Sequence, residues 1–279
     1  MNLTEFRLLR DLIEEEFGLL LNINHKDVLS AKLEPKVLSL KLRSFREYYY
    51  YLLNHPLSKK ELSSLPSAIM NMESYFLREK AQFSLFIDLL KEIKKEISTG
   101  AKRTIRILSA GCASGQEPYS IYISIKNSGI PVSDWNLQIF GIDIDQFAIE
   151  KAKSGVFNQY SLRGMDKEIT DKIFRKINNN YHKIDGNIIK KVNFSQGNIL
   201  QPTVFKNLKN LDFIFCRNLL IYMSKRAKNR IALNLWEALS ETGYLFIGQS
   251  ESLMKYNDFF KPVRFPEAIV YQKRNFQDF

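Results

Sequence analysis

Cysteine and histidine are scarce in this chain. Its 279 residues include two cysteines, Cys112 and Cys216, and three histidines. Two cysteines cannot form the disulfide framework of a small secreted fold and are too few for a cysteine-rich metal site. We therefore expect a protein of a reducing, cytoplasmic compartment, with no metal site.

Long apolar runs are missing as well. The first twenty residues, MNLTEFRLLRDLIEEEFGLL, are interrupted by charges every few positions, unlike a signal peptide. A membrane span needs about 20 consecutive apolar residues, and no stretch of the sequence approaches that length. Hydrophobic residues at 45% and aromatics at 13% still suffice for a packed core. The sequence thus predicts a soluble globular protein without membrane insertion.

Acidic residues are fewer than basic ones, 30 against 41, which gives a net charge of +11. A basic surface favours an anionic partner, either nucleic acid or an acidic protein face. A charge that only keeps the protein soluble explains the composition equally well. Charge alone leaves these alternatives open.

The chain changes texture near residue 98. Before it, helical patterns cover 3–18, 26–43, 44–55 and 58–70, and a longer helix is predicted over 74–97. After it, short apolar runs alternate with helical patterns, which is typical of a mostly parallel sheet covered on both faces. We expect a helical domain over 1–72, a linking helix over 73–98 and an α/β domain over 99–279. An excursion over about 155–192 should contain a hairpin that turns at Asp185-Gly186.

A glycine-rich turn follows the first apolar run of the α/β part, in RILSAGCASGQEPYSI over 106–121. Such a turn allows a ligand to approach the backbone, and the following helix start offers free N–H groups. Gly115 is followed by Gln116 and Glu117, so the Gly-Lys-Ser/Thr of a phosphate-binding loop is absent. The spacing of Gly111 and Gly115 also fails the dinucleotide pattern.

Two acids beside this turn suggest a different ligand. Glu117 would repel a pyrophosphate but attract a sulfonium or ammonium group, and Asp143 ends the next strand, where it can accept ribose hydroxyls. Each acid alone has an ordinary explanation, as a first-turn helix acid or a turn former. Together they favour S-adenosylmethionine (SAM), a nucleoside without phosphate.

Five blocks in this order, SAGCASGQEPYSI, GIDID, GNILQP, FIFCRNLLIYM and GYLFIGQSESL, resemble the CheR-type chemotaxis receptor methyltransferases. Upstream, MNMESYFLRE is similar to that family's entry into its methyltransferase domain. The resemblance implies a Rossmann-like class I methyltransferase sheet, an all-helical N-terminal domain and a small antiparallel β excursion. It implies a SAM-dependent protein-glutamate O-methyltransferase, with S-adenosylhomocysteine (SAH) as product.

The resemblance also assigns site residues. Arg78 and Tyr222 would be catalytic, steering charge and geometry without transferring protons. The donor would be bound by residues of the segment that enters the domain, of the glycine turn and of three strand ends: Ser74, Arg78, Gly111, Glu117, Asp143, Asn198, Ile199, Asn218 and Leu219. Met72 stands where the family usually has Asn, and Gln116 where it usually has Glu. Without the resemblance, an Arg paired to Glu73 or Glu79 would be the ordinary interpretation of Arg78.

The implied chemistry needs no general base, because a glutamate with an ordinary pKa of about 4.3 is ionised at neutral pH. The implied partner is the acidic cytoplasmic helical bundle of a methyl-accepting chemoreceptor, and we expect a monomer. Lys32, Lys36 and Arg43 share one helical face if the helix continues past Pro35, and would dock that bundle. Residues 181–192 are a candidate site for a receptor's C-terminal tail.

Two alternatives remain at this point. A nucleic-acid methyltransferase would suit the basic charge, but the strand end reads CRNLLIY and has no Asp/Asn-Pro-Pro-aromatic tetrad. A module that binds the donor without catalysis would tolerate Met72. We expect no nucleic-acid partner.

Overall fold

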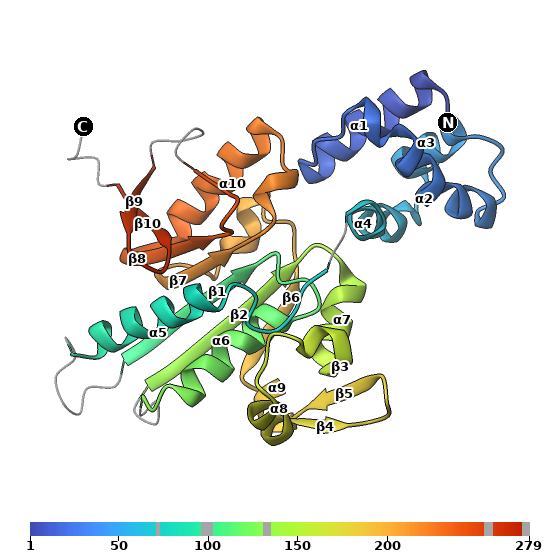
Figure 1. Ribbon diagram of the computed structural model, residues 1–279. Coiled ribbons are helices and arrows are strands. Elements are labelled where there is room, and N and C mark those ends of the chain that lie inside the picture. The colour runs from blue at the N-terminus through green and yellow to red at the C-terminus, as the bar shows by residue number, and fades with distance from the viewer. Residues whose placement is uncertain (71–72, 96–102, 131–134, 254–258, 275–279) are drawn as a thin grey trace.

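A computed structural model describes residues 1–70, 73–95, 103–130, 135–253 and 259–274 (Figure 1). The first part is helical, as predicted: α1 (Leu3–Phe17), η1 (Ile23–His25), α2 (Lys26–Ser39), α3 (Phe45–Asn54) and α4 (Ser58–Ile69). Asn2 caps α1 through a capping box, and Gly18 ends it in the left-handed conformation at φ +70°. Ser44 accepts a hydrogen bond from the Glu47 N–H and so caps α3, as the sequence indicates.

Helix α2 continues past Pro35, as the docking hypothesis required, but it ends at Ser39. Lys41 has a positive φ of 56°, a conformation that L-residues rarely adopt and that turns the chain away from the helix. The prediction of a helix through residue 43 was therefore wrong. Arg43 does not lie on the α2 face that carries Lys32 and Lys36.

The second part contains a seven-stranded sheet in the order β6-β2-β1-β7-β8-β10-β9. Its strands are β1 (Arg103–Ala110), β2 (Trp135–Asp143), β6 (Val192–Gln196), β7 (Leu211–Cys216), β8 (Leu239–Ile247), β9 (Phe260–Arg264) and β10 (Ile269–Lys273). Neighbours among β6, β2, β1, β7 and β8 pair in parallel, whereas β10 pairs antiparallel with β8 and β9. The mostly parallel sheet of a class I methyltransferase is thereby confirmed.

Helices cover both faces of the sheet, because alternate strand residues point to opposite sides. One core joins strand residues such as Leu108 and Ile214 to α10 (Lys225–Ala238), near η4 (Pro202–Phe205). The other joins Ile107 and Phe213 to α5 (Lys80–Lys95) and α6 (Gln116–Asn127). Helix α7 (Gln146–Ser154) follows β2 and contacts both β2 and β6.

The excursion forms a separate three-stranded antiparallel sheet, β3-β5-β4. Its elements are β3 (Val156–Asn158), η3 (Gln159–Leu162), α8 (Lys167–Ile173), β4 (Phe174–Lys176), β5 (Tyr181–Ile184) and α9 (Gly186–Ile189). The small antiparallel excursion is confirmed, but the hairpin at Asp185-Gly186 was wrong. The Asp185 carboxylate accepts a hydrogen bond from the Asn187 N–H and caps α9, and β6 beyond it joins the large sheet.

The linking helix begins at Lys80 and not at Ser74. Leu77 and Glu79 have positive φ angles of 55° and 62°, which no helix tolerates. We call residues 73–79 the strap. It crosses from the helical part along the excursion, where the Phe76 N–H donates to the Ser161 carbonyl and the buried Phe76 ring packs edge-on against Phe157 and Phe174.

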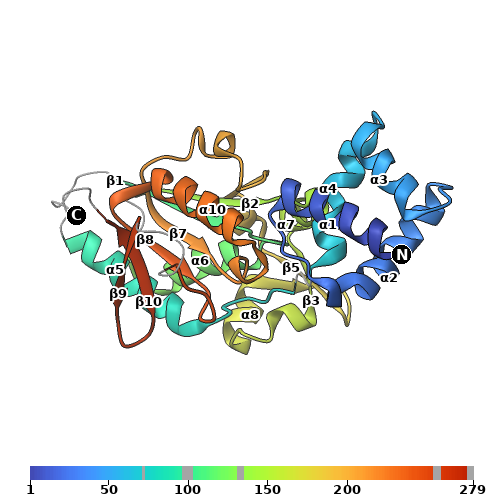
Figure 2. The ribbon, with the colours of Figure 1, turned by 90° about the horizontal axis from the view of Figure 1, so that it is seen from above.

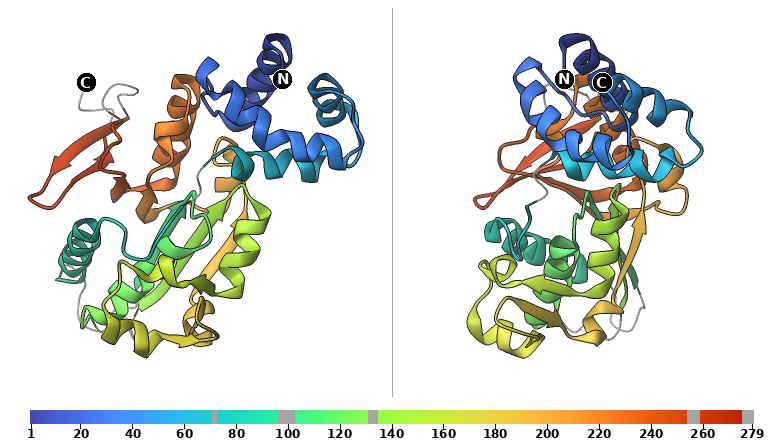
Figure 3. Two further views of the ribbon diagram at one scale, coloured as in Figure 1. Left: turned by 45° about the vertical axis from the view of Figure 1, so that its right-hand side comes forward. Right: turned by 90° about the vertical axis from the view of Figure 1, so that its right-hand side faces the viewer.

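The helices α1–α4 lie together on one side of the molecule, at the right in Figures 1 and 2, and the edge strand β9 and its neighbour β10 lie on the other side. Further views show α10 beside the helical part, with α5 and α6 on the other side of the sheet (Figure 3). The segment after α1 pairs with the loop after β7: Leu19 bridges Met223, and the Leu20 N–H donates to the Tyr222 carbonyl at 2.8 Å. One continuous core therefore runs from the helical part into the sheet.

No helix of the described ranges combines the length and apolarity needed to cross a bilayer.

Candidate functional site

A pocket lies at the carboxyl ends of β1, β2, β6 and β7, where ligands bind in this type of sheet. It holds about 1120 Å³, its opening to solvent included. All ten predicted site residues line it: Ser74, Arg78, Gly111, Glu117, Asp143, Asn198, Ile199, Asn218, Leu219 and Tyr222. They come from the strap, the glycine turn, α6, the ends of β2, β6 and β7, and η5 (Leu220–Tyr222). Their individual roles stay predictions.

The glycine turn differs in detail from the sequence interpretation. Gly111 has φ +80°, and a Cβ there would lie 2.9 Å from Leu219 Cδ2. Gly115 is absent from the pocket wall, and its Cβ would meet Ala152 of α7 at 2.8 Å. The N–H groups of Gly111 and Cys112 both donate to the Ile142 carbonyl. These donors are thus satisfied internally and do not form a phosphate cradle.

Asp143 is buried at the end of β2, and backbone donors hold its carboxylate. The Ala113 N–H donates to Oδ2 at 2.8 Å and the Asp145 N–H to Oδ1 at 3.0 Å. Burial raises the pKa of Asp143, and these N–H groups act in the opposite direction. Each carboxylate oxygen keeps a further lone pair, so Asp143 can still accept two ribose hydroxyls.

Glu117, in the first turn of α6, is largely covered, with 14% of its side chain exposed, and its carboxylate accepts two side-chain hydrogen bonds. The Ser109 hydroxyl donates to Oε1 at 2.7 Å, and Arg217 Nη1 donates to Oε2 at 3.0 Å. Burial raises the pKa of Glu117, whereas the Arg217 guanidinium and the Ser109 hydroxyl oppose that rise. The structure therefore gives Glu117 a cationic protein partner that the sequence interpretation did not include.

Sequence reasoning missed Arg217 and Glu79. The Arg217 side chain, 2% exposed, lies between Glu117 and Glu79, with 3.1 Å from its Nη2 to Glu79 Oε2. Arg217 also donates to the Arg78 carbonyl, which ties the strap to the end of β7. Its position directly before Asn218, at the end of a fully buried strand, was the signal in the sequence, because a charge there must be paired.

Glu251 was also missed, although it lies in the block GQSESL. Its carboxylate accepts from the backbone N–H groups of Asn218 at 2.8 Å, Gly248 at 2.6 Å and Ile221 at 3.2 Å. Asn218 has a positive φ of 57°, and its side chain donates to Glu79 at 3.3 Å. One acid thus organises the loop that carries Asn218, Leu219 and Tyr222.

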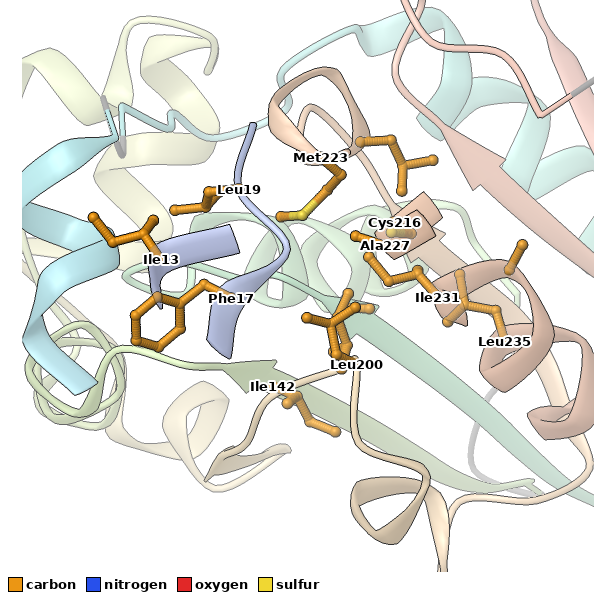
Figure 4. Close-up of a cluster of buried hydrophobic side chains, with 14 of the residues drawn as sticks. Ile13, Phe17, Leu19, Ile142, Leu200, Cys216, Met223, Ala227, Ile231 and Leu235 are labelled. Carbon is orange, nitrogen blue, oxygen red and sulfur yellow. The ribbon is translucent and has the colours of Figure 1, made fainter. Parts of the chain in front are cut away.

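The far end of the pocket is apolar and includes residues of the helical part. Phe17 and Leu19 line it together with Leu200, Met223 and Ile231, and their side chains gather in one cluster (Figure 4). Asn198 joins the same two parts, because its side-chain amide donates to the Glu16 carbonyl at 2.8 Å. Nothing in the sequence pattern assigned residues 17 and 19 to this wall.

Arg78 and Tyr222 are both half-buried. Arg78 Nη1 donates to the Glu73 carbonyl at 3.3 Å, and its guanidinium lies 5.9 Å from the Tyr75 ring centre. Within the described residues Arg78 has no ion pair, since Glu79 pairs with Arg217 instead. Met72, the departure noted in the sequence, lies outside the described residues.

Lys32 and Lys36 of α2 both bind other groups of the helical part. Lys36 Nζ contacts Glu61 at 2.8 Å and the Ser64 hydroxyl at 2.6 Å, and Lys32 Nζ donates to the Ile69 carbonyl at 2.9 Å. The prediction that Lys32, Lys36 and Arg43 share one helical face was wrong, because Arg43 lies beyond the end of α2. Lys36 pairs within the helical part because Glu61 of α4 faces it.

Comparisons with known proteins agree with this architecture. Residues 72–269 match the family model "CheR methyltransferase, SAM binding domain", and residues 4–69 match "CheR methyltransferase, all-alpha domain". Chemotaxis protein methyltransferase 2 of Vibrio cholerae is 30% identical over 97% of this chain and 93% of its own length. The probable biofilm formation methyltransferase WspC of Pseudomonas aeruginosa is 28% identical over 94% of this chain and 60% of its own length. The chain therefore belongs to the CheR methyltransferase family of SAM-dependent enzymes.

Proposed function

We propose that this protein transfers the methyl group of SAM to glutamate side chains of chemoreceptors and so forms glutamate methyl esters. The observation that carries the proposal is one pocket with a buried carboxylate, Asp143, a largely covered one, Glu117, and an apolar far end. Relatives named chemotaxis protein methyltransferases support the receptor as the substrate.

The residues present fit this donor. When bound, SAM supplies a methyl group on a sulfonium, which a carboxylate can attack directly. Asp143 offers acceptor lone pairs for ribose hydroxyls, and Phe17, Leu19 and Leu200 offer an apolar surface for the adenine. Glu117 places negative charge where the cationic end belongs. A phosphorylated coenzyme would meet these acids unfavourably.

The acceptor glutamate is ionised at neutral pH, so the enzyme must orient and desolvate it. Holding the reacting groups in line can account for about 7–11 kcal/mol of barrier lowering. Arg78 has a charge without an internal ion pair among the described residues and can steer the acceptor carboxylate. Tyr222 lines the same pocket and offers a hydroxyl near the reacting centre.

We infer that exposed cations of the helical part dock the acidic receptor bundle. Lys41, Arg43 and Arg46 follow α2 and are exposed, unlike the tethered Lys36. Charges at such a rim raise the association rate more than the affinity. Arg43→Glu with Arg46→Glu should raise the apparent KM and reduce its salt dependence. The exposed Lys126→Glu, at the end of α6, is the matched control.

One assay tests the reaction. Labelled SAM is incubated with an acidic receptor fragment, with RNA or with neither, and the products are then treated with base. Carboxyl methyl esters release volatile methanol, whereas methylated nucleobases do not. Base-labile label that depends on the receptor fragment is expected. Stable label in RNA, or no transfer to the fragment despite SAM binding, would overturn the proposal.

A further inference from the structure

Arg217 is a buried cation, and the proposed methyl transfer assigns it no role. Its side chain, 2% exposed, contacts Glu117 and Glu79, whose side chains are 14% and 13% exposed. It also donates to the Arg78 carbonyl and lies 5.3 Å from the Phe83 ring centre. Strands, strap and α6 therefore meet at this one guanidinium.

The charges of this cluster sum to one negative charge, from two carboxylates and one guanidinium. SAM carries a sulfonium, an ammonium and a carboxylate, hence one net positive charge, and SAH lacks the sulfonium and is neutral. The net charge of the cluster therefore attracts SAM, whereas SAH has no net charge for it to attract. Without Arg217 the same wall would hold two unpaired buried carboxylates, which a protein avoids by protonating one of them.

We propose that Arg217 is a positioning residue of the donor site: it sets the charge of the Glu79–Glu117 wall and holds Arg78 of the strap over the pocket. This inference rests on the proposed function. Arg217 itself transfers no proton, since an arginine stays charged in proteins. It acts through Glu117, which lines the pocket, and through the strap carbonyl that it binds.

The proposal predicts a pH dependence that an ordinary structural ion pair would not give. The groups that act electrostatically on Glu117 or respond to it are Arg217, Glu79, Cys112, Cys216 and, through Cys112, Asp143. Burial raises the pKa of both thiols well above its ordinary value, so they stay neutral. Removing the guanidinium takes away the main influence that keeps the pKa of Glu117 down. Below that raised pKa Glu117 is protonated and no longer attracts a cation, so SAM affinity should fall as pH falls.

The test is calorimetric titration of the full chain with SAM and with SAH between about pH 8 and about pH 6. Arg217→Met should weaken SAM binding about tenfold or more and make it pH-dependent. Arg217→Lys keeps the charge, so its affinity should be lower but vary with pH as in the wild type. Arg217→Met with Glu79→Gln restores one net negative charge and removes the smaller influence of Glu79 on Glu117, so its pH dependence should be weaker than that of Arg217→Met alone. Glu79→Gln alone should lower the ratio of SAM to SAH affinity about threefold, as a screened unit charge would.

Arg103→Met is the matched control, because Arg103 also pairs with a buried carboxylate, Asp212, at 3.1 Å, but at the start of β1. It should lower stability and leave both titrations unchanged. A flat, wild-type-like pH profile in Arg217→Met would overturn the inference. If Arg217→Met does not fold, the affinity ratio of Glu79→Gln decides: an unchanged ratio overturns it. A wild-type protein that binds neither SAM nor SAH would instead refute the proposed function.

Discussion

Glu251 offers a quantitative test of what stabilises the loop that carries Asn218, Leu219 and Tyr222. Its carboxylate accepts three backbone N–H groups, from Asn218, Ile221 and Gly248. A hydrogen bond to a charged group contributes about 1.5–3 kcal/mol, so three set an upper bound of about 4.5–9 kcal/mol. Glu251 is only half-buried, and water would replace part of these bonds. We expect Glu251→Ala to lower the free energy of unfolding by about 3 kcal/mol.

Glu251→Gln separates charge from shape. The glutamine oxygen can replace Oε2, which serves Asn218 and Gly248, but its amide then faces the Ile221 N–H, a donor against a donor. The cost should be about 1.5 kcal/mol, the lower end for one charge-assisted bond. Because this loop lines the donor pocket, SAH affinity should fall about tenfold in the alanine variant, equivalent to 1.4 kcal/mol.

Urea unfolding and calorimetric titration with SAH measure both effects. Glu237→Ala is the matched control, because Glu237 pairs with Lys209 on the surface at 3.3 Å and both side chains are nearly half exposed. It should change stability by less than about 0.5 kcal/mol. An alanine variant at position 251 that unfolds and binds SAH like the wild type would refute the role assigned to this carboxylate.

Gly18→Ala should destabilise the protein by about 1–3 kcal/mol, because φ is +70° and the new Cβ would lie 2.4 Å from Ala227 Cβ. In urea unfolding, Gly129→Ala is the control: its φ is +71° but its Cβ meets nothing within 4 Å, so a similar loss in both would exclude the steric cause. Tyr222→Phe should bind SAM normally but methylate more slowly in single-turnover experiments, and equal rates would remove the hydroxyl from the mechanism. Because burial raises the pKa of Asp143, the folded protein retains a proton that the unfolded chain releases between the ordinary value of 3.8 and the raised one. The unfolding free energy of the wild type relative to Asp143→Asn should therefore increase as pH falls through this interval; urea titrations showing a decrease would contradict it.

The fold and most of the pocket residues could be predicted because their motifs follow strands. Gly111, Asp143, Asn198 and Asn218 all lie at carboxyl strand ends, and parallel pairing necessarily brings such ends to one edge. The class of ligand followed from local chemistry, two acids and a glycine turn without a phosphate-binding lysine.

What could not be predicted depends on contacts between distant segments. Glu79 meets Arg217, and Phe17 meets the donor pocket, across separations that no periodicity records. Local competition caused the other errors. Asp185-Gly186 suits a hairpin turn, but the Asp185 side chain caps a helix instead. The sequence suggests that Lys36 is a free surface charge, because its partner Glu61 belongs to another helix.

The bridge between Leu19 and Met223 has a consequence for exchanging parts between relatives. The natural place to join two proteins is after α4, near residue 70, yet residues 18–20 already contact the segment over 222–224. A chimaera that takes its first helices from another enzyme would also replace Phe17 and Leu19, which line the apolar end of the pocket. Swaps intended to redirect the choice of receptor should therefore retain this chain's own Phe17, Gly18 and Leu19.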